Sequence, residues 1–127
     1  MANKSIQMKD GSDNLYPVSI ALTDITSQCP CKLPDGDHWV HIDYDNVNRI
    51  VKGWFSVLGA TAFRTSQAII TIPAAYRPSS DATIPMMVTN ASGTSCYRGT
   101  VSSSSGNVYQ GLTNTATGVF CVFEYKI

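Results

Sequence analysis

Charged residues are scarce in this chain. Only 14% of its 127 residues are charged, and nine basic side chains balance nine acidic ones. Proteins that bind nucleic acid or anionic membranes attract them with an excess of positive charge, so we expect neither kind of partner. The surface left to Ser, Thr, Asn and Gly suits hydrogen bonding to neutral polar molecules.

Long hydrophobic runs are also missing. No apolar stretch approaches the roughly 20 residues that span a bilayer, and the opening residues 1–4 are not followed by the apolar core of a signal peptide. We therefore expect a soluble protein made in a cytoplasm, without membrane insertion. The four cysteines fit this origin as free thiols.

Signatures of catalysis are absent as well. No serine stands in a G-x-S-x-G setting, and the glycines form no phosphate-binding run. Aspartates 35, 37, 43, 45 and 81 fall in predicted turns or on the outer face of a strand, whereas a glycosidase needs two opposed carboxylates. We predict that the protein is not an enzyme and needs no cofactor.

One metal-site candidate lies between residues 29 and 41. Cys29, Cys31, His38 and His41 offer the thiolates and imidazoles that zinc prefers. Only Pro30 separates the two cysteines, however, and a strand over 38–44 points the two histidines to opposite faces. The favoured interpretation is a segment with free thiols and no bound metal.

What the chain does have is a series of short alternating segments with turn signals roughly every ten residues. Strands are predicted at 38–44, 51–57, 69–72, 83–89, 95–101, 108–112 and 119–126. This spacing predicts an all-β fold, an antiparallel β-sandwich of jelly-roll type. The last strand is apolar on both faces, which is typical of a central strand or of one covered by another subunit.

The sequence divides into three predicted parts. Residues 1–28 form an N-terminal attachment or oligomerisation segment, residues 29–37 a Pro- and Gly-containing linker, and residues 38–127 the head domain. A hairpin is predicted within 1–17, with its turn at 9–14. The spacing of Val18, Leu22 and Ile25 predicts a short helix over 18–26, which either joins three chains or docks on its own domain.

The strands at 38–44 and 51–57 are predicted to form a hairpin. With a two-residue loop at 46–47, Trp39 lies opposite Trp54 and His41 lies opposite Lys52. Both indoles then point away from the core. They serve equally well as a platform for a ligand or as an oligomer interface.

Two segments carry a family resemblance. TIPAAYRPSSDATIPM at 71–86, followed by Gly/Ser-rich hairpins and the closing strand VFCVFEYKI, resembles the receptor-binding heads of bacteriophage tail-tip and baseplate proteins. The opening IQMKDGSDNLYPVS at 6–19 resembles the start of many phage tail and baseplate proteins. The resemblance implies a homotrimer in the virion tail, bound to other tail or baseplate proteins, whose head recognises a host cell-surface glycan.

Saccharides are held by aromatic faces and by short polar side chains that hydrogen-bond hydroxyl groups. In this interpretation Tyr76 and Arg77 form an exposed pair on a turn. Two alternatives remain: a purely structural virion protein (a decoration or tail-tip plug), and a lectin-like domain of a cellular organism. The candidate saccharide-binding residues are Trp39, Trp54, Tyr76, Arg77, Asp81, Arg98, Asn107 and Tyr109.

Overall fold

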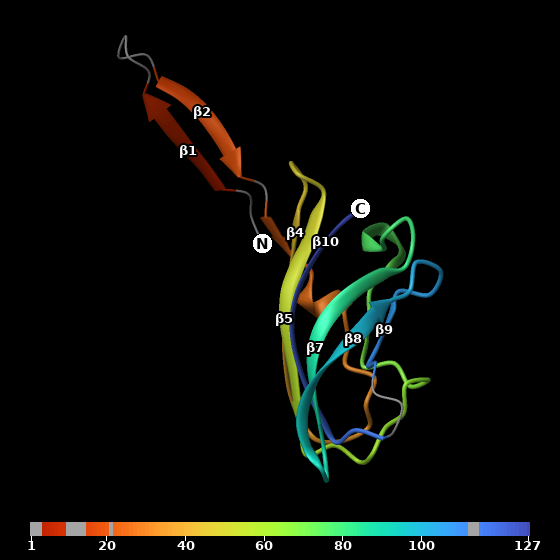
Figure 1. Cartoon of the computed structure of the whole chain (residues 1–127). Helices are drawn as coiled ribbons and strands as arrows, with labels where there is room; N and C mark the ends of the chain where they lie inside the picture. The colour runs from red at the N-terminus through yellow and green to blue at the C-terminus, as the bar shows by residue number, and fades with distance from the viewer. Residues whose placement is uncertain (1–3, 10–14, 21, 112–114) are drawn as a thin grey trace.

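Alternating apolar and polar side chains build most of the chain into strands. The computed structural model describes residues 4–9, 15–20, 22–111 and 115–127, shown in Figure 1. Within them lie ten strands: β1 (Lys4–Lys9), β2 (Leu15–Ile20), β3 (Leu22–Asp24), β4 (Asp37–Asp45), β5 (Ile50–Leu58), β6 (Ile70–Thr71), β7 (Ala82–Asn90), β8 (Gly93–Val101), β9 (Asn107–Tyr109) and β10 (Gly118–Lys126). Two short 3-10 helices, η1 (Thr26–Gln28) and η2 (Ala74–Tyr76), complete them.

Eight of these strands form one antiparallel sheet in the order β3-β4-β5-β10-β7-β8-β9-β6. The last strand, β10, inserts between β5 and β7. Its inner side chains are buried, whereas Phe120 and Val122 point outward and are exposed. The predicted all-β fold is therefore confirmed, and the two-faced last strand is central in the sheet.

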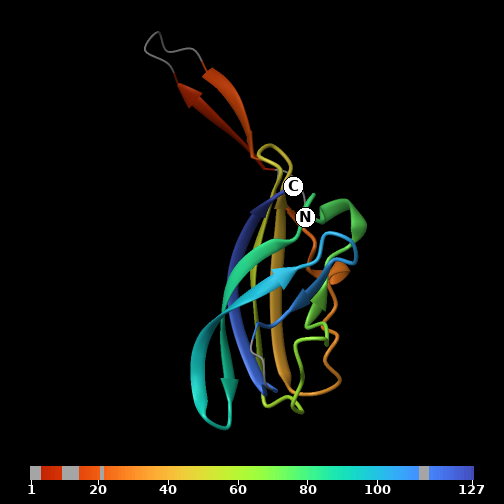
Figure 2. The ribbon, with the colours of Figure 1, turned by 45° about the vertical axis from the view of Figure 1, so that its right-hand side comes forward.

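The sheet curls until its two ends are joined. Beyond β3, Cys31 forms a β-bridge with Ile70 of β6, and the Lys32 amide donates to the carbonyl of Ile69 at 2.7 Å. A second bridge joins Phe63 to Ala116. Figure 2 shows the irregular segments on the concave side of the long strands. The sheet thus encloses one core, as the two layers of a sandwich do.

The core is aliphatic and aromatic. Phe55 and Phe123 contact each other with ring centroids 6.1 Å apart, and Phe55 is fully buried. The other large, fully buried members of the core are Phe63, Ile25, Ile42, Ile69, Ile70, Ile72, Ile84, Val51, Val57, Val88 and Val101.

The described residues contain no helix long and apolar enough to span a membrane.

The N-terminal segment is a hairpin without a helix. β1 and β2 pair from Lys4 with Ile20 to Lys9 with Leu15, so the predicted hairpin is confirmed; most of its predicted turn lies outside the described residues. The helix predicted over 18–26 is wrong, because Val18 lies in β2 and Leu22 in β3. Two helical turns are too short to be stable alone, whereas β3 satisfies its backbone by pairing with β4.

The segment predicted as a linker, residues 29–37, packs onto the head. Cys29 and Leu33 are buried in the core, and Ile25 before them is fully buried and donates its amide to the carbonyl of Ile42 at 2.9 Å. Prolines and turn-forming residues indicate an irregular backbone, but they do not show whether that backbone packs against the core.

In Figures 1 and 2 the β1–β2 hairpin projects from the sheet.

The predicted register of β4 and β5 is wrong by two residues. Asp45 pairs with Ile50, so the loop holds residues 46–49. The Asp45 carboxylate accepts hydrogen bonds from the amides of Val47 and Asn48, at 3.0 and 3.1 Å, and Arg49 adopts a φ of 57°. A shift of two preserves the face of every side chain, so Trp39 and Trp54 still point outward.

Replacing Gly53 of β5 tests this register. A Cβ atom at Gly53 would collide with the backbone carbonyl of His41 and the Cα of Ile42 on β4. We expect Gly53→Ala to lower the free energy of unfolding by about 1–3 kcal/mol, measured by urea denaturation. Ser56→Ala, on the outer face of the same strand, should change it by less than about 0.5 kcal/mol. Unchanged or increased stability of Gly53→Ala would contradict the β4–β5 pairing.

Thiol reactivity tests the packing of the core. All four cysteines are free, as predicted; Cys29 and Cys121 are buried, and Cys96 is exposed. Burial raises the pKa of Cys121 to about 12, and burial with the nearby Asp24 raises the pKa of Cys29 to about 11. Because the thiolate is the reactive form, a disulfide reagent at pH 8 should modify Cys96 rapidly, and Cys29 and Cys121 only after denaturation. A fast phase that survives Cys96→Ser but not Cys121→Ser would contradict this packing.

Candidate ligand-binding face

The convex side of the sheet, called here the outer face, carries the side chains that the core does not use. It is formed by the outward residues of β3, β4, β5, β10, β7 and β8. Because paired residues lie directly opposite each other on neighbouring strands, the strand registers arrange these side chains into rows that cross the sheet.

The first row is charged. Asp24 of β3 pairs with Asp43 of β4, Asp43 with Lys52 of β5, and Lys52 with Glu124 of β10. Three carboxylates and one ammonium group thus lie in line. In a chain with so few charges, this is a local concentration of hydrogen-bonding groups.

The second row is built around an indole. Trp54 of β5 lies between His41 of β4 and Val122 of β10, and further along the face Pro85 of β7 pairs with Arg98 of β8. Trp54 is 39% exposed and Val122 is 61% exposed. These side chains offer an apolar surface directly beside the charged row.

The third row is mostly apolar. Trp39 pairs with Ser56, Ser56 with Phe120, and Phe120 with Met87. Trp39 is 49% and Phe120 45% exposed, and the exposed Leu58 lies two residues beyond Ser56 on β5. Trp39 is therefore a diagonal neighbour of Trp54. Along the strands, the outer face changes from charged through aromatic to apolar.

A hollow lies where the charged and aromatic rows meet. It has a volume of about 470 Å³ and opens widely to the solvent. Ligand sites typically combine apolar walls with a few polar groups, and this lining fits that description. Its lining residues are Asp43, Lys52, Gly53, Trp54, Pro85, Val122, Phe123 and Glu124.

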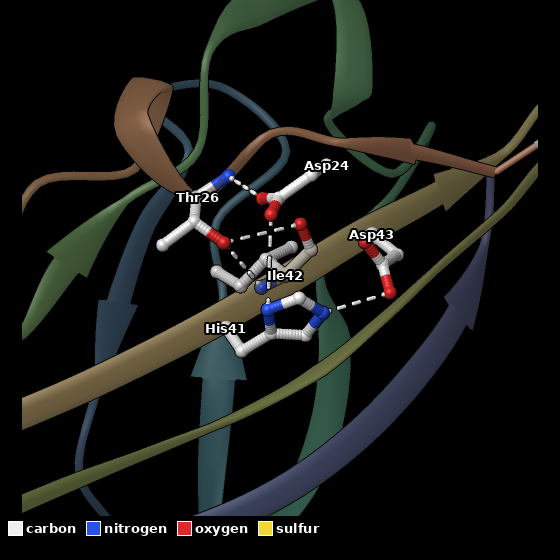
Figure 3. A network of polar contacts seen from close by, with 5 residues as sticks. All are labelled: Asp24, Thr26, His41, Ile42 and Asp43. Atoms are coloured by element: carbon white, nitrogen blue, oxygen red, sulfur yellow. Dashed lines mark hydrogen bonds and ion pairs between the residues drawn. The ribbon is translucent and has the colours of Figure 1, made fainter. Parts of the chain in front are cut away.

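Asp43, which lines the hollow, also belongs to a polar cluster with Asp24 and His41 that is shown in Figure 3. His41 Nε2 lies 2.9 Å from Asp43 Oδ2, and His41 Nδ1 lies 3.9 Å from Asp24 Oδ2. Because an ionised carboxylate only accepts hydrogen bonds, Nε2 is the donor to Asp43. Asp24 Oδ1 accepts from the Thr26 amide at 2.9 Å. The imidazole thus lies between two carboxylates from neighbouring strands.

The electrostatics of this cluster are unbalanced. Hydrogen bonds from Thr26 and, to a lesser extent, the electrostatic influence of His41 lower the pKa of Asp24, so its carboxyl group is ionised at neutral pH. Asp43 Oδ1 is buried and has no hydrogen-bond partner in the described part of the chain. Leaving a buried acceptor unpaired costs about 1–3 kcal/mol, and more for a charged group. The cluster is therefore suited to receiving a hydrogen-bond donor or a cation.

The structure divides the predicted saccharide-binding residues into two groups. Trp39, Trp54 and Arg98 are exposed on the outer face. The other five lie around η2, β9 and the β8–β9 connection. Tyr76 packs against Tyr44, with ring centroids 5.0 Å apart.

The predicted exposed Tyr76–Arg77 pair is wrong, since both residues are only partly exposed and both have structural contacts. Arg77 Nε donates to the carbonyl of Ile72 at 3.1 Å, and Arg77 Nη1 donates to the carbonyl of Ser104 at 2.9 Å. These bonds fasten the segment after β6 to the β8–β9 connection.

The remaining three residues also have partners within the fold. The Asp81 carboxylate accepts from the amide and the hydroxyl of Ser103, both at 2.8 Å. Asn107 accepts from Thr71 at 2.7 Å and donates to the Tyr109 hydroxyl at 3.0 Å. None of Asp81, Asn107 or Tyr109 lines the hollow beside Trp54.

The four residues of the metal-site candidate do not converge. Cys29, Cys31 and His38 line a second hollow of about 340 Å³ together with Val40, whereas His41 lies on the opposite face of β4 with Asp43. The alternation argument placed the two histidines correctly. It did not reveal that His41 has two carboxylate neighbours.

Sequence reasoning missed Asp24, Lys52 and Glu124 as members of the site, and it interpreted Asp43 as a solvated carboxylate. Lys52 and Glu124 could have been found from alternation, because both point outward in correctly predicted strands. Asp24 could not have been found in this way, because its segment was predicted as a helix.

Comparisons of the sequence with protein-family models and with curated proteins find no match, so the functional argument rests on this geometry.

The two arginines among the candidate saccharide-binding residues test which candidates stabilise the fold and which are only exposed. Arg77→Ala removes hydrogen bonds to two backbone carbonyls, and we expect it to reduce the free energy of unfolding by about 1–3 kcal/mol. Arg98→Ala, at an exposed position of β8, should reduce it by less than about 0.5 kcal/mol. Thermal or urea denaturation of both variants measures the difference. Equal losses would contradict the structural role of Arg77.

Proposed function

We propose that this chain is a non-catalytic binding domain that recognises a saccharide at the hollow beside Trp54. The observation that carries the proposal is the meeting of an exposed indole with a row of charged side chains on one rigid sheet face. Sugars present flat C–H surfaces that pack on aromatic rings and hydroxyl groups that hydrogen-bond carboxylates and ammonium groups. Trp54 supplies the first contact, and Asp43, Lys52 and Glu124 supply the second.

The rigidity of this site favours recognition. Trp54 and Glu124 stand on β5 and β10, two strands that pair over eight successive residues. Groups held on paired strands lose little conformational entropy when a ligand binds, which strengthens association. Binding at a preformed, open surface also suits a large glycan, because its chain can extend beyond the hollow.

The resemblance of the sequence to phage tail-tip and baseplate heads supports a place in the virion tail. In that setting the saccharide belongs to the host cell surface, and the β1–β2 hairpin contacts other virion proteins. We propose that three copies assemble through the apolar end of the outer face, around Leu58, Met87 and Phe120. Exposed apolar groups that adjoin one another mark interaction sites, and this end lies two rows from the charged row.

A second candidate function uses only the apolar end. The exposure of Trp39, Phe120 and Met87 in one row favours a structural virion protein, whose outer face packs against other virion proteins and binds no sugar. The two functions differ in which end of the outer face is essential. A lectin-like domain of a cellular organism would use the same hollow as the first candidate.

A glycan array tests the saccharide site. Trp54→Ala removes the aromatic wall of the hollow, and we expect the affinity for a bound glycan, or for host cell walls, to fall at least about tenfold. Trp54→Phe should retain part of that affinity. Val47→Ala, at an exposed apolar residue in the β4–β5 loop, is the matched control and should bind normally. Failure of the unaltered protein to bind any glycan or cell wall would overturn the proposal.

Light scattering tests the assembly. We expect the unaltered protein to be a trimer, and Phe120→Lys to be monomeric but still folded, because a lysine at an exposed sheet position is tolerated in the monomer. Val47→Lys, at an exposed position in the β4–β5 loop, should remain trimeric. A monomeric unaltered protein would contradict the proposed assembly. A trimer that binds no glycan would favour the structural function.

A further inference from the structure

The cluster of Asp24, His41 and Asp43 has the composition of a metal site. Each residue offers one ligand atom, and these atoms lie within 4.8 Å of one another. Two donors that share a metal ion at about 2.1 Å each lie roughly 3–4 Å apart. The separations of 2.9 and 3.9 Å between the imidazole nitrogens and the two carboxylates are therefore close to those of a formed site.

A separate observation shows that one oxygen of the cluster has no hydrogen-bond partner among the described residues. Asp43 Oδ1 is buried without a hydrogen-bond partner in the described residues, although buried acceptors almost always have one. In addition, Asp24 and Asp43 are direct partners across β3 and β4, an arrangement in which like charges repel. A divalent cation bound between the two carboxylates would cancel that repulsion.

The two carboxylates are held in place by the backbone around them. The Thr26 amide donates to Asp24 Oδ1, and the Thr26 hydroxyl accepts from the Ile42 amide at 2.9 Å. Together with the bond from the Ile25 amide to the Ile42 carbonyl, these contacts lock η1 against β4, as Figure 3 shows for Thr26 and Ile42. Thr26 is thus a positioning residue for Asp24.

From these contacts we propose that Asp24, His41 and Asp43 bind one divalent cation of intermediate softness, such as Mn²⁺ or Zn²⁺. Carboxylate oxygens suit Mn²⁺, and a mixed set of oxygen and imidazole nitrogen donors also suits Zn²⁺. The ion replaces the hydrogen bond from His41 to Asp43, and the imidazole turns to present one nitrogen to it. The His41 side chain is 41% exposed, which leaves room for this rotation and for water on the remaining positions.

The cation site shares Asp43 with the proposed saccharide site, but metal binding is tested without a glycan, so either proposal can fail alone. The cation site also differs from the cysteine-containing hollow, because Cys29, Cys31 and His38 lie on the other face of β4. Mn²⁺ is the sharper probe, since thiolates select Zn²⁺ over Mn²⁺.

The test uses the full chain after chelator treatment and dialysis. Titration with MnCl₂, followed by the loss of the free Mn²⁺ electron paramagnetic resonance signal, should show one bound ion per chain. In an NMR spectrum, Mn²⁺ should broaden the signals of the His41 ring and the Trp54 indole N–H before those of Trp39. Saturating Mn²⁺ should raise the melting temperature.

Asp43→Asn and Asp24→Asn should each weaken Mn²⁺ binding at least tenfold, whereas Asp37→Asn, an exposed carboxylate on the same strand, should not. Asn keeps the shape of Asp, and melting curves of the metal-free variants show whether they fold. If a variant unfolds, the NMR broadening in the unaltered protein decides the question. The absence of binding, broadening elsewhere, or Zn²⁺ binding abolished by Cys31→Ser but not by Asp43→Asn would overturn the proposal.

Discussion

The insertion of the last strand between β5 and β7 is the constraint on which the structure depends. β10 pairs with β5 over eight residues and with β7 at its start, so it joins two hairpins that are otherwise separate in sequence. Its inner side chains fill the core, and the Cys121 thiol donates to the carbonyl of Pro85 on β7 at 3.1 Å. Without β10 the sheet would have two unpaired central edges.

The same insertion creates the outer face. Strict alternation along β10 leaves Phe120, Val122 and Glu124 outward, and each of them extends a row that begins on β3 or β4. The central position of the strand explains why its inner residues are apolar, but it does not explain Phe120 and Val122, which gain nothing from exposure to water. Adjoining exposed apolar groups of this kind mark interaction sites, which is the basis of the assembly proposed above.

The fold was predictable where a local pattern decides it. Alternation placed Ile84, Met86 and Val88 of β7 on one face, which is the buried one. The two apolar faces of the last strand predicted that it is either central in the sheet or covered by another subunit, and it is central. It failed where tertiary pairing decides the structure. The spacing of Val18, Leu22 and Ile25 fits a helix as well as it fits strands, and only the pairing of β3 with β4 selects the strand. Prolines around Cys29 indicate irregular backbone, but the burial of Cys29 depends on the curl of the sheet.

The candidate site shows how much a small error of register matters. A shift of two residues leaves every side chain of β4 and β5 on its predicted face, yet it changes all of their neighbours. Asp45 holds the longer loop through its bonds to Val47 and Asn48. As a result Trp54 lies beside His41 instead of Trp39, and Lys52 lies beside Asp43. The chemistry of the outer face thus depends on the β4–β5 turn, whose Asp45 carboxylate holds the loop and also attracts Lys52 of the charged row.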